Sequence, residues 1–310
     1  MKQEAEKILT EVKKVIVGKD EVLEKILMAV LSQGHVLLED VPGTGKTSAA
    51  LAFSRALGIR YARIQFTPDV LPSDIVGFSV YDKNKGDFVY KPGAVLTNLL
   101  LADEINRTSS KTQSALLEVM EERQVTVDGR TYRLPEPFLV IATQNPAGAA
   151  GTQLLPQAQL DRFMVKLQMG YPDFASQVEI LRDRQGTDPM DAVCEVSSAG
   201  EIVRLQQEAG KVQMKEELLE YVTRLAEASR AHPLVTLGIS PRGALAVCRM
   251  ARARALVEDR NYVIPADVAY VFTDVCAHRL VLSAKARINE TRAEDVLAEI
   301  LQDTKRPDAL

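Results

Sequence analysis

The sequence predicts an α/β fold with a parallel sheet that is covered by helices on both faces, followed by a helical domain. Short apolar runs of strand length alternate with helical stretches over the first 186 residues, as in a parallel sheet. A Gly-rich turn joins the first of these runs to a helix. Beyond residue 190 the strand-like runs stop and helical periodicity takes over. We therefore expect a core over residues 1–186, a short linker and a helical domain over residues 190–310.

The expected elements of the core can be placed in order along the chain. Helical periodicity covers 3–16 and 20–33, where Gly34 is placed as a C-terminal stop, and it returns over 46–57 after the Gly-rich turn. The apolar runs expected to form the five strands of the sheet are 35–38, 61–66, 99–102, 138–143 and the more weakly patterned 164–169.

Two hairpins are expected as insertions in this core, near 78–91 and 124–134. Their alternating residues flank turn centres at Asn84–Gly86 and Asp128–Gly129. The first tip contains NKGD, a literal match to the guanine-reading NKxD motif of GTPases. That motif follows a later strand, downstream of the acidic metal-binding strand, whereas this copy precedes it. Turn chemistry explains these residues, so we reject a GTPase.

The C-terminal part is expected to consist of helices. The last of them is predicted to begin at Thr291, with Glu294 three residues later completing a capping box. Helices are expected near 199–211, 215–231, 241–257, 265–281 and 292–302.

Composition excludes several classes of protein. The chain has 310 residues, 46% of them hydrophobic and 26% charged, which is ordinary for a globular protein. Its formal net charge of −4 argues against a domain that binds by neutralising DNA phosphates. Three scattered cysteines without a CxxC pair indicate neither a disulfide framework nor a zinc site. The charged N-terminal stretch fits neither a signal peptide nor a membrane span, so we expect a cytoplasmic protein.

The stretch LLEDVPGTGKTSAA, residues 37–50, predicts a phosphate-binding loop. A Gly-rich turn at a helix N-terminus presents several backbone N–H groups to an anion. Lys46 is expected to reach the β- and γ-phosphates, and the Thr47 hydroxyl to ligate Mg²⁺. Asp40 stands where the strict GxxxxGK[ST] pattern has glycine, but it lies at the strand-to-loop junction and its carboxylate can point away from the phosphates. The predicted nucleotide-binding residues of the loop are Pro42, Gly43, Thr44, Gly45, Lys46, Thr47 and Ser48.

Two other strands are expected to bring polar residues to the same sheet edge. LLLADEIN (99–106) ends in Asp103, which we expect to hold Mg²⁺ through water or Thr47, and Glu104, which we expect to orient and polarise an attacking water. FLVIATQN (138–145) delivers Asn145, which is placed to hydrogen-bond the γ-phosphate or that water. The predicted site therefore binds a nucleoside triphosphate together with Mg²⁺.

Several motifs together resemble the AAA+ ATPases and, within them, the MoxR family. They are VIVGKDEV (15–22), LLEDVPGTGKT, LLLADEINR, KTQSALLEVMEERQVTVDG (111–129), IATQNP (141–146), GTQLLPQAQLDRF (151–163) and LGISPRGAL (237–245). The resemblance spans about residues 10–300 and implies an AAA+ P-loop NTPase core followed by a small all-helical lid domain. Members of the family look similar at Asp40, which makes that residue no anomaly.

The resemblance also implies roles for matching residues. Arg162 in LDRF looks like the arginine finger that reaches into the nucleotide site of a neighbouring subunit. Arg242 resembles sensor 2, a cation in a first helical turn that a nearby triphosphate would compensate. Val17 and Gly18 resemble the segment that lines the adenine pocket, so the resemblance implies that the cofactors are ATP and Mg²⁺.

Partners follow from the same resemblance. It implies a homo-oligomeric ring, with a hexamer as the expected size, that remodels or activates a protein client. Partners with a von Willebrand A domain and metal cofactor insertion are among the roles implied, and nucleic acid is not expected. Two alternatives stay open: a DNA-working AAA+ motor, and an ATP-binding switch with little turnover. Thr108–Ser110 and Gln157 depart from the family pattern, and these departures bear on the inter-subunit contacts implied near Arg162.

Overall fold

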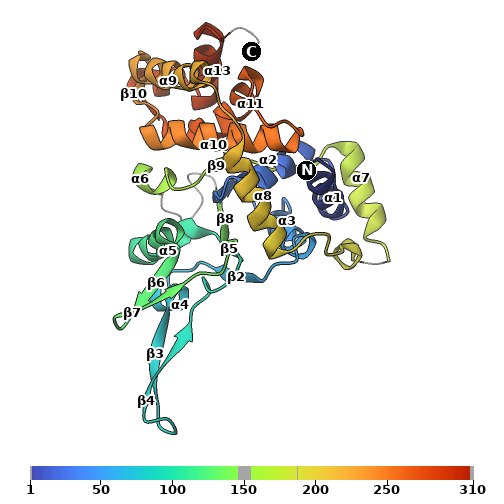
Figure 1. Cartoon of the computed structure of the whole chain (residues 1–310), viewed down its shortest axis with the longest axis vertical. Helices are drawn as coiled ribbons and strands as arrows, with labels where there is room; N and C mark the ends of the chain where they lie inside the picture. The colour runs from blue at the N-terminus through green and yellow to red at the C-terminus, as the bar shows by residue number, and fades with distance from the viewer. Residues whose placement is uncertain (1, 146–154, 187, 308–310) are drawn as a thin grey trace.

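The computed structural model describes residues 2–145, 155–186 and 188–307. Pro146 of the IATQNP motif and residues 151–154 of the GTQLL motif lie outside the described residues. A five-stranded parallel sheet forms the centre of the first part of the chain (Figure 1). Its strand order is β2-β5-β8-β1-β9. This confirms the predicted sheet. Its strands are β1 (Val36–Glu39), β2 (Tyr61–Gln65), β5 (Leu99–Asp103), β8 (Leu139–Gln144) and β9 (Val165–Leu167).

The two faces of the sheet contribute to two different apolar clusters. On β5, Leu99 and Leu101 belong to one cluster, and Leu100 and Ala102 belong to the other. The first cluster includes side chains of α1 (Lys2–Lys13), α2 (Asp20–Leu31) and α3 (Lys46–Ala56), and the second includes those of α5 (Ser110–Glu122). Burial on both faces explains why these strands read as continuous apolar runs rather than as alternating ones.

The turn after α2 differs in detail from the prediction. Gln33, not Gly34, takes the left-handed conformation, with φ of 56°. The Gly34 N–H donates to the Ala29 carbonyl at 2.8 Å, which closes the helix. Gly34 is required for a different reason, because a Cβ there would lie 2.4 Å from Cβ of Met164.

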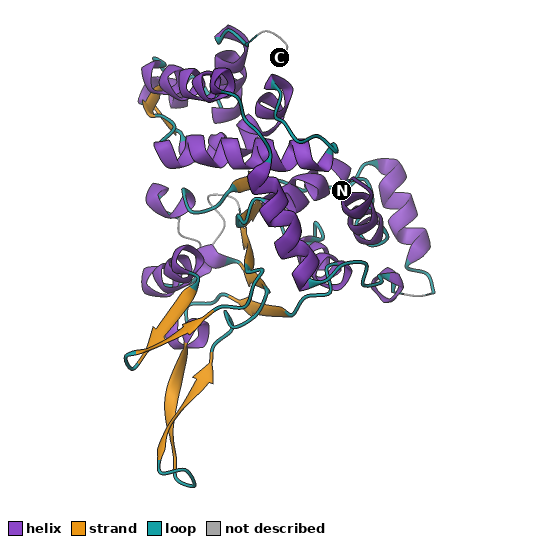
Figure 2. Ribbon diagram, viewed as in Figure 1, coloured by secondary structure: helices purple, strands orange, loops and turns teal. Residues whose placement is uncertain are grey.

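Both predicted hairpins are present and extend away from the sheet (Figure 2). The longer one pairs β3 (Gly77–Asp82) with β4 (Asp87–Pro92), and the NKGD motif falls at its tip as expected. The shorter one pairs β6 (Gln124–Val127) with β7 (Arg130–Arg133). Tyr90 and Tyr132 stack at 4.1 Å between ring centroids and join the two hairpins. A short helix that the sequence analysis did not place, α4 (Pro72–Val76), leads into the longer one.

The C-terminal part is helical, with one correction. Two short strands, β10 (Val235–Leu237) and β11 (Val281–Leu282), pair antiparallel, so the lid is not all-helical. For this reason α11 (Pro265–Cys276) ends at Cys276 instead of 281, and the 3₁₀ turn Ala277–Arg279 (η3) leads into β11. The other helices of this part are α8 (Ala199–Lys211), α9 (Glu216–Ala231), α10 (Pro241–Val257), α12 (Ala284–Ile288) and α13 (Ala293–Asp303), with a 3₁₀ turn η2 (Pro189–Ala192) before α8. Two short helices of the core precede them, α6 (Gln157–Leu160) and α7 (Phe174–Asp183).

The predicted cap of the last helix is displaced by one residue. The N-cap of α13 is Arg292, and its backbone N–H donates to Asp295 at 3.2 Å. The reciprocal carboxylate is therefore Asp295, not Glu294, and Thr291 lies outside the cap. Two patterns overlap here, Thr291 with Glu294 and Arg292 with Asp295. The sequence alone does not decide which of the two carboxylates accepts from the N-cap backbone N–H.

The lid packs directly on the helices of the core. Side chains of α8, α10 and α11 belong to the same apolar cluster as those of α1, α2 and α3. Two ion pairs cross this contact: Lys25 Nζ lies 2.6 Å from Asp274 Oδ2, and Arg254 pairs with Glu24 while its guanidinium carbon lies 3.6 Å from the Tyr270 ring centroid. The lid is thereby held against one face of the core.

Candidate nucleotide site

A cavity of about 640 Å³ opens at the carboxyl edge of the sheet, where β1, β2, β5 and β8 end. One part is polar and one part is apolar. The polar part is lined by residues 42–48 of the loop and by Arg63, Gln65, Asp103, Glu104, Thr143 and Asn145. The apolar part is lined by Val15, Ile16, Val17, Tyr171, Pro172 and Ile180. The residues predicted to surround a magnesium triphosphate therefore meet in one cavity.

The loop has the backbone that an anion site requires. Gly43 and Gly45 both have φ of 89°, which a residue with a side chain adopts only under strain. Lys46 is buried at the first turn of α3, and its Nζ donates to the carbonyl oxygens of Asp40 at 2.8 Å and Val41 at 2.9 Å. Burial lowers the pKa of Lys46, and the acids around it oppose that change. The Lys46 ammonium group thus donates hydrogen bonds to its own loop. When a nucleotide binds, phosphate oxygens can replace these two carbonyl oxygens as its acceptors.

Asp40 points away from the phosphate-binding part of the loop, as the sequence analysis anticipated. Its Oδ2 accepts from the Gly170 N–H at 2.5 Å, and its Oδ1 accepts from its neighbour Val41 N–H at 2.9 Å. Gly170 lies in the turn that leads from β9 to α7. The carboxylate therefore ties the loop to that turn, which explains why an acid is compatible with an anion site.

Asp103 is positioned by two partners that the sequence did not reveal. Its Oδ1 accepts from the Thr143 hydroxyl at 2.6 Å, and its Oδ2 pairs with Arg63 at 2.7 Å. The same Thr143 hydroxyl accepts from the Glu104 backbone N–H at 2.8 Å. Strands β2, β5 and β8 are thus joined at their carboxyl ends by one short chain of polar contacts.

The Glu104 carboxylate is held in place by hydrogen bonds from three side chains. Oε1 accepts from Asn145 Nδ2 at 3.0 Å, and Oε2 accepts from Gln65 Nε2 at 2.9 Å and from Arg107 at 2.8 Å. The Arg107 hydrogen bond, with help from Asn145, holds the pKa of Glu104 below its usual value of 4.5. Its backbone is left-handed at φ 57°, a conformation that costs a non-glycine residue about 1 kcal/mol or more and is typical of functional sites. At neutral pH this carboxylate is ionised and oriented.

Val17 lines the apolar part of the cavity as expected, but Gly18 is not among the residues that line it. Gly18 has φ of 72°, and a Cβ there would lie 2.1 Å from Ser176 Oγ in the first turn of α7. This glycine is required because α7 approaches the backbone closely. The structure thus gives Gly18 a packing role, and its resemblance to a residue of the adenine pocket stays a prediction.

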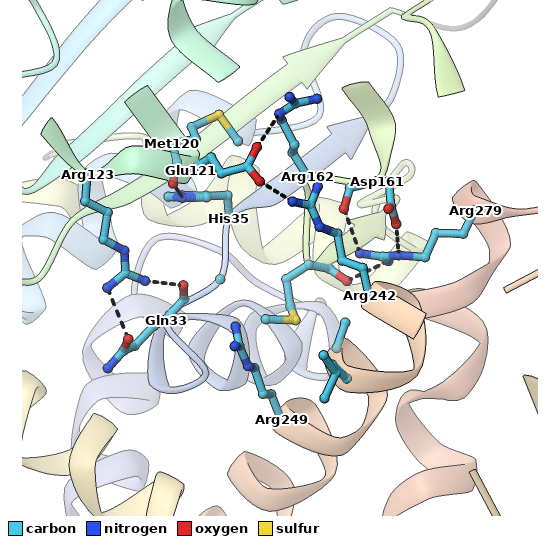
Figure 3. Close-up of a pocket in the computed structure, with 14 residues that line it drawn as sticks. Gln33, His35, Met120, Glu121, Arg123, Asp161, Arg162, Arg242, Arg249 and Arg279 are labelled. Carbon is cyan, nitrogen blue, oxygen red and sulfur yellow. Dashed lines mark hydrogen bonds and ion pairs between the residues drawn. The ribbon is translucent and has the colours of Figure 1, made fainter. Parts of the chain in front are cut away.

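Arg162 and Arg242 are not in this cavity. They line a second cavity of about 390 Å³ between the core and the lid, and both pair with Glu121 of α5 (Figure 3). Arg162 Nε lies 3.1 Å from Glu121 Oε2 and also donates to the Ala158 carbonyl at 2.8 Å. Arg242 does not line the nucleotide cavity of its own chain, because the first turn of α10 lies beside α5 rather than beside the loop. Its expected contact with a triphosphate stays a prediction.

Several residues of these sites had no signal in the sequence. Gln65 and Arg63 alternate along β2 with apolar residues, which reads as an ordinary half-exposed strand. Glu121 is one acid of an amphipathic helix, and Arg279 lies inside the stretch 265–281 that reads as a helix. Thr143 was the one residue with a usable signal, because it ends a strand next to Gln144 and Asn145.

The donor set suits magnesium. Mg²⁺ prefers oxygen ligands and is usually held by one or two carboxylates together with substrate phosphates and water. Thr47 supplies a hydroxyl and Asp103 a carboxylate, and both line the cavity beside the loop. Among the described residues no cluster of three or more His, Cys, Asp or Glu side chains could hold an ion without a substrate. The site thus fits an ion that arrives with a nucleotide.

Comparison with known proteins agrees with this geometry. A model of the ATPase family associated with various cellular activities (AAA) matches residues 35–165, and a model of the AAA lid domain matches residues 227–300. Chaperone MoxR1 of Mycobacterium tuberculosis is 45% identical over 97% of this chain and 82% of its own. Protein MoxR of Methylorubrum extorquens is 32% identical over 94% of this chain and 91% of its own. A crystal structure of a protein from Cytophaga hutchinsonii superimposes with a TM-score of 0.91 at 36% identity, covering 99% of this chain and 96% of that one.

The parallel sheet, the Gly-rich loop, the acidic strand end and the helical lid define a P-loop nucleotide-binding protein of the AAA+ class. Within that class, the similarity to chaperone MoxR1 and protein MoxR extends over nearly the whole chain. The chain belongs to the MoxR family of AAA+ ATPases. None of the helices in the described part of the chain has the length and apolar character needed to cross a bilayer.

Proposed function

We propose that this chain hydrolyses Mg²⁺-bound ATP in the cavity at the sheet edge, with Glu104 as the residue that activates the attacking water. The observation that carries the proposal is the Glu104 carboxylate, which Asn145 and Gln65 hold at 3.0 and 2.9 Å in the cavity that Lys46 also lines. An ionised, oriented carboxylate can accept a proton from water, and an amide beside it can hold that water or the γ-phosphate.

The other residues of the cavity would bind and orient the nucleotide. The loop N–H groups and Lys46 would bind the phosphates, and the apolar part around Val17 and Ile180 suits a purine base. Thr47 and Asp103 would hold Mg²⁺, which bridges phosphate oxygens and neutralises developing charge when bound. Arg63 would then share Asp103 with the ion, and its half-exposed side chain leaves it room to move.

We further propose that Arg162 and Arg242 act together on ATP bound by a neighbouring copy in a ring, with a hexamer as the expected size. Both lie outside their own nucleotide cavity, and they share Glu121 as a carboxylate partner. Two guanidinium groups beside one exchangeable carboxylate are suited to bind a phosphate group. The core over residues 1–186 and the lid over 190–310 would each supply one of the two arginines.

The role of the ring is proposed to be chaperone-like remodelling or activation of a protein complex. The relative named chaperone MoxR1 supports this class, and so does the longer hairpin, on which Phe78, Tyr81 and Phe88 are about half exposed or more. Partners that bear a von Willebrand A domain, including those that receive a metal cofactor, are candidate clients.

Glu104→Gln tests the hydrolysis proposal. We expect ATP affinity to stay within about twofold of wild type, because the binding groups remain, and phosphate release to fall by about 10²-fold or more. Glu118→Gln on the exposed side of α5 is the matched control and should keep wild-type turnover. Wild-type turnover by Glu104→Gln would refute the assignment.

The client can be sought with the same variant. Glu104→Gln in ATP should retain a protein that Lys46→Ala, in which ATP binding is expected to be weakened, does not retain. Equal recovery on both variants would speak against a client whose binding depends on ATP.

A further inference from the structure

Arg279 belongs to the lid, but most of its hydrogen bonds go to the core segment that carries Arg162. It lies at the end of η3 and is 4% exposed. Its guanidinium donates to the Phe163 carbonyl at 2.7 Å, the Asp161 carbonyl at 3.2 Å and the Met164 carbonyl at 3.2 Å. Arg279 Nε also donates to Asp161 Oδ1 at 2.8 Å (Figure 3). The backbone on both sides of Arg162 is therefore bound by one side chain of the lid.

Breaking these hydrogen bonds would cost free energy, because the groups that make them are buried. A guanidinium is kept out of water only where hydrogen bonds replace its hydration, and here burial lowers the pKa of Arg279 while Asp161 opposes that change. Phe163 and Met164 are buried as well, so water has little access to their carbonyl oxygens and cannot readily replace the Arg279 hydrogen bonds. A second contact in the same place, from Gln157 Nε2 to the His278 carbonyl at 2.8 Å, ties α6 to η3. The segment after α6 is thus fixed to the lid.

The same arginine supports the first turn of α10, where Arg242 lies. Asp161 Oδ2 is 3.5 Å from the hydroxyl of Ser240, the N-cap residue of α10. A Cβ added to Gly243 would lie 2.9 Å from Cδ of Arg279, so the arginine stem packs directly against this turn. Arg279 is in contact with the segments that present Arg162 and Arg242, one from the core and one from the lid.

We propose that Arg279 is a positioning residue that fastens the Arg162 segment to the first turn of α10, so that both arginines are presented as a fixed pair. This inference rests on the proposed action of that pair on ATP bound by a neighbouring copy. Glu121 pairs with both guanidinium groups, but its side chain is partly exposed and does not fix their backbones. Arg279 does so through carbonyl oxygens and packing.

The test uses Arg279→Lys and Arg279→Gln in the full chain. Both should bind ATP with wild-type affinity, because Arg279 lies outside the nucleotide cavity, and both should release phosphate about 10- to 100-fold more slowly because Arg162 is misplaced. The matched control is Arg254→Gln, which removes another arginine that ties lid to core. It should lower the unfolding temperature and leave turnover unchanged.

Mixing separates a positioning role from a merely structural one. Glu104→Gln subunits cannot hydrolyse but carry intact arginines, so adding them should restore hydrolysis at the sites of Arg279→Lys subunits. A general structural defect would not be rescued, since those sites would themselves be damaged. Loss of turnover without rescue, or wild-type turnover, would overturn the inference.

One further mixture separates this inference from the proposed function. Arg162→Ala mixed with Glu104→Gln should be rescued if arginines act between subunits. No rescue there refutes the proposed function, whereas rescue of Arg162→Ala but not of Arg279→Lys refutes only the role of Arg279. If the Arg279 variants do not fold, Asp161→Asn, which weakens the same anchor at one hydrogen bond, takes their place with the same outcomes.

Discussion

Replacing Asp40 by glycine restores the strict phosphate-loop pattern, yet we expect it to destabilise the protein. The carboxylate accepts from the N–H groups of Gly170 and Val41 at 2.5 and 2.9 Å and is 9% exposed. Hydrogen bonds to charged groups contribute about 1.5–3 kcal/mol each, and glycine adds about 0.5–1 kcal/mol of backbone entropy cost. Water can replace part of the loss at the half-buried Val41 and Gly170, so we expect a net loss of about 2–4 kcal/mol.

The same change should hardly affect ATP binding, because the carboxylate faces the β9–α7 turn and not the phosphates. We expect Kd to change by less than about threefold, which corresponds to less than about 0.7 kcal/mol. Thermal unfolding should shift downward by about 5–10 °C. Asp40→Asn, which keeps one acceptor oxygen, should show roughly half the loss of stability. A large gain in ATP affinity with unchanged stability would refute the reasoning, since it would mean that Asp40 acts as a defect in the phosphate site.

Three further outcomes are expected. Lys46→Ala should weaken ATP binding about tenfold or more in direct titration, since the cation is lost while the loop backbone remains; unchanged affinity would refute the phosphate assignment. Arg107→Gln should raise the pKa of Glu104, because the Arg107 hydrogen bond is what mainly lowers it. The lowered pKa keeps the carboxylate ionised and stabilises the folded state, and this stabilisation is lost as pH falls through the pKa of the folded protein. The acid limb of its pH–rate profile should therefore move to higher pH, and an unmoved limb would exclude Glu104 as the titrating base. Gly18→Ala should destabilise by about 1–3 kcal/mol through its contact with Ser176, measured by thermal unfolding, whereas Gly210→Ala, where a Cβ meets nothing, should not.

The sequence was sufficient where neighbouring residues along the chain decide the outcome. Strand β1, the Gly-rich loop and α3 are contiguous, so the position of Lys46 at a helix N-terminus followed from local pattern alone. Asp103 and Asn145 were placed correctly because parallel strands bring their carboxyl ends to one edge. Both hairpins followed from turn residues and alternation.

The sequence was insufficient where a contact depends on how separate elements pack. The position of Arg242 depends on where the lid rests against α5, which no local pattern encodes. Arg279 donates to backbone carbonyl oxygens, and these acceptors cannot be identified from residue types because every residue has one. Strands β10 and β11 have three and two residues, too short for period-2 alternation to be recognised.

The separation of the two cavities bears on how copies of this chain would assemble. No lining residue is shared between them, and α6, which precedes Arg162, lies on the opposite side of the molecule from α7, which lines the nucleotide cavity (Figure 1). If these arginines reach the nucleotide site of a neighbouring copy, the two copies must meet head to tail. Such contacts close into a ring when the rotation that relates successive copies brings the last copy back to the first. Glu121 suits this arrangement, because a phosphate that reaches the two arginines replaces one anion by another. The two arginines therefore have an anionic partner both before and after the copies meet.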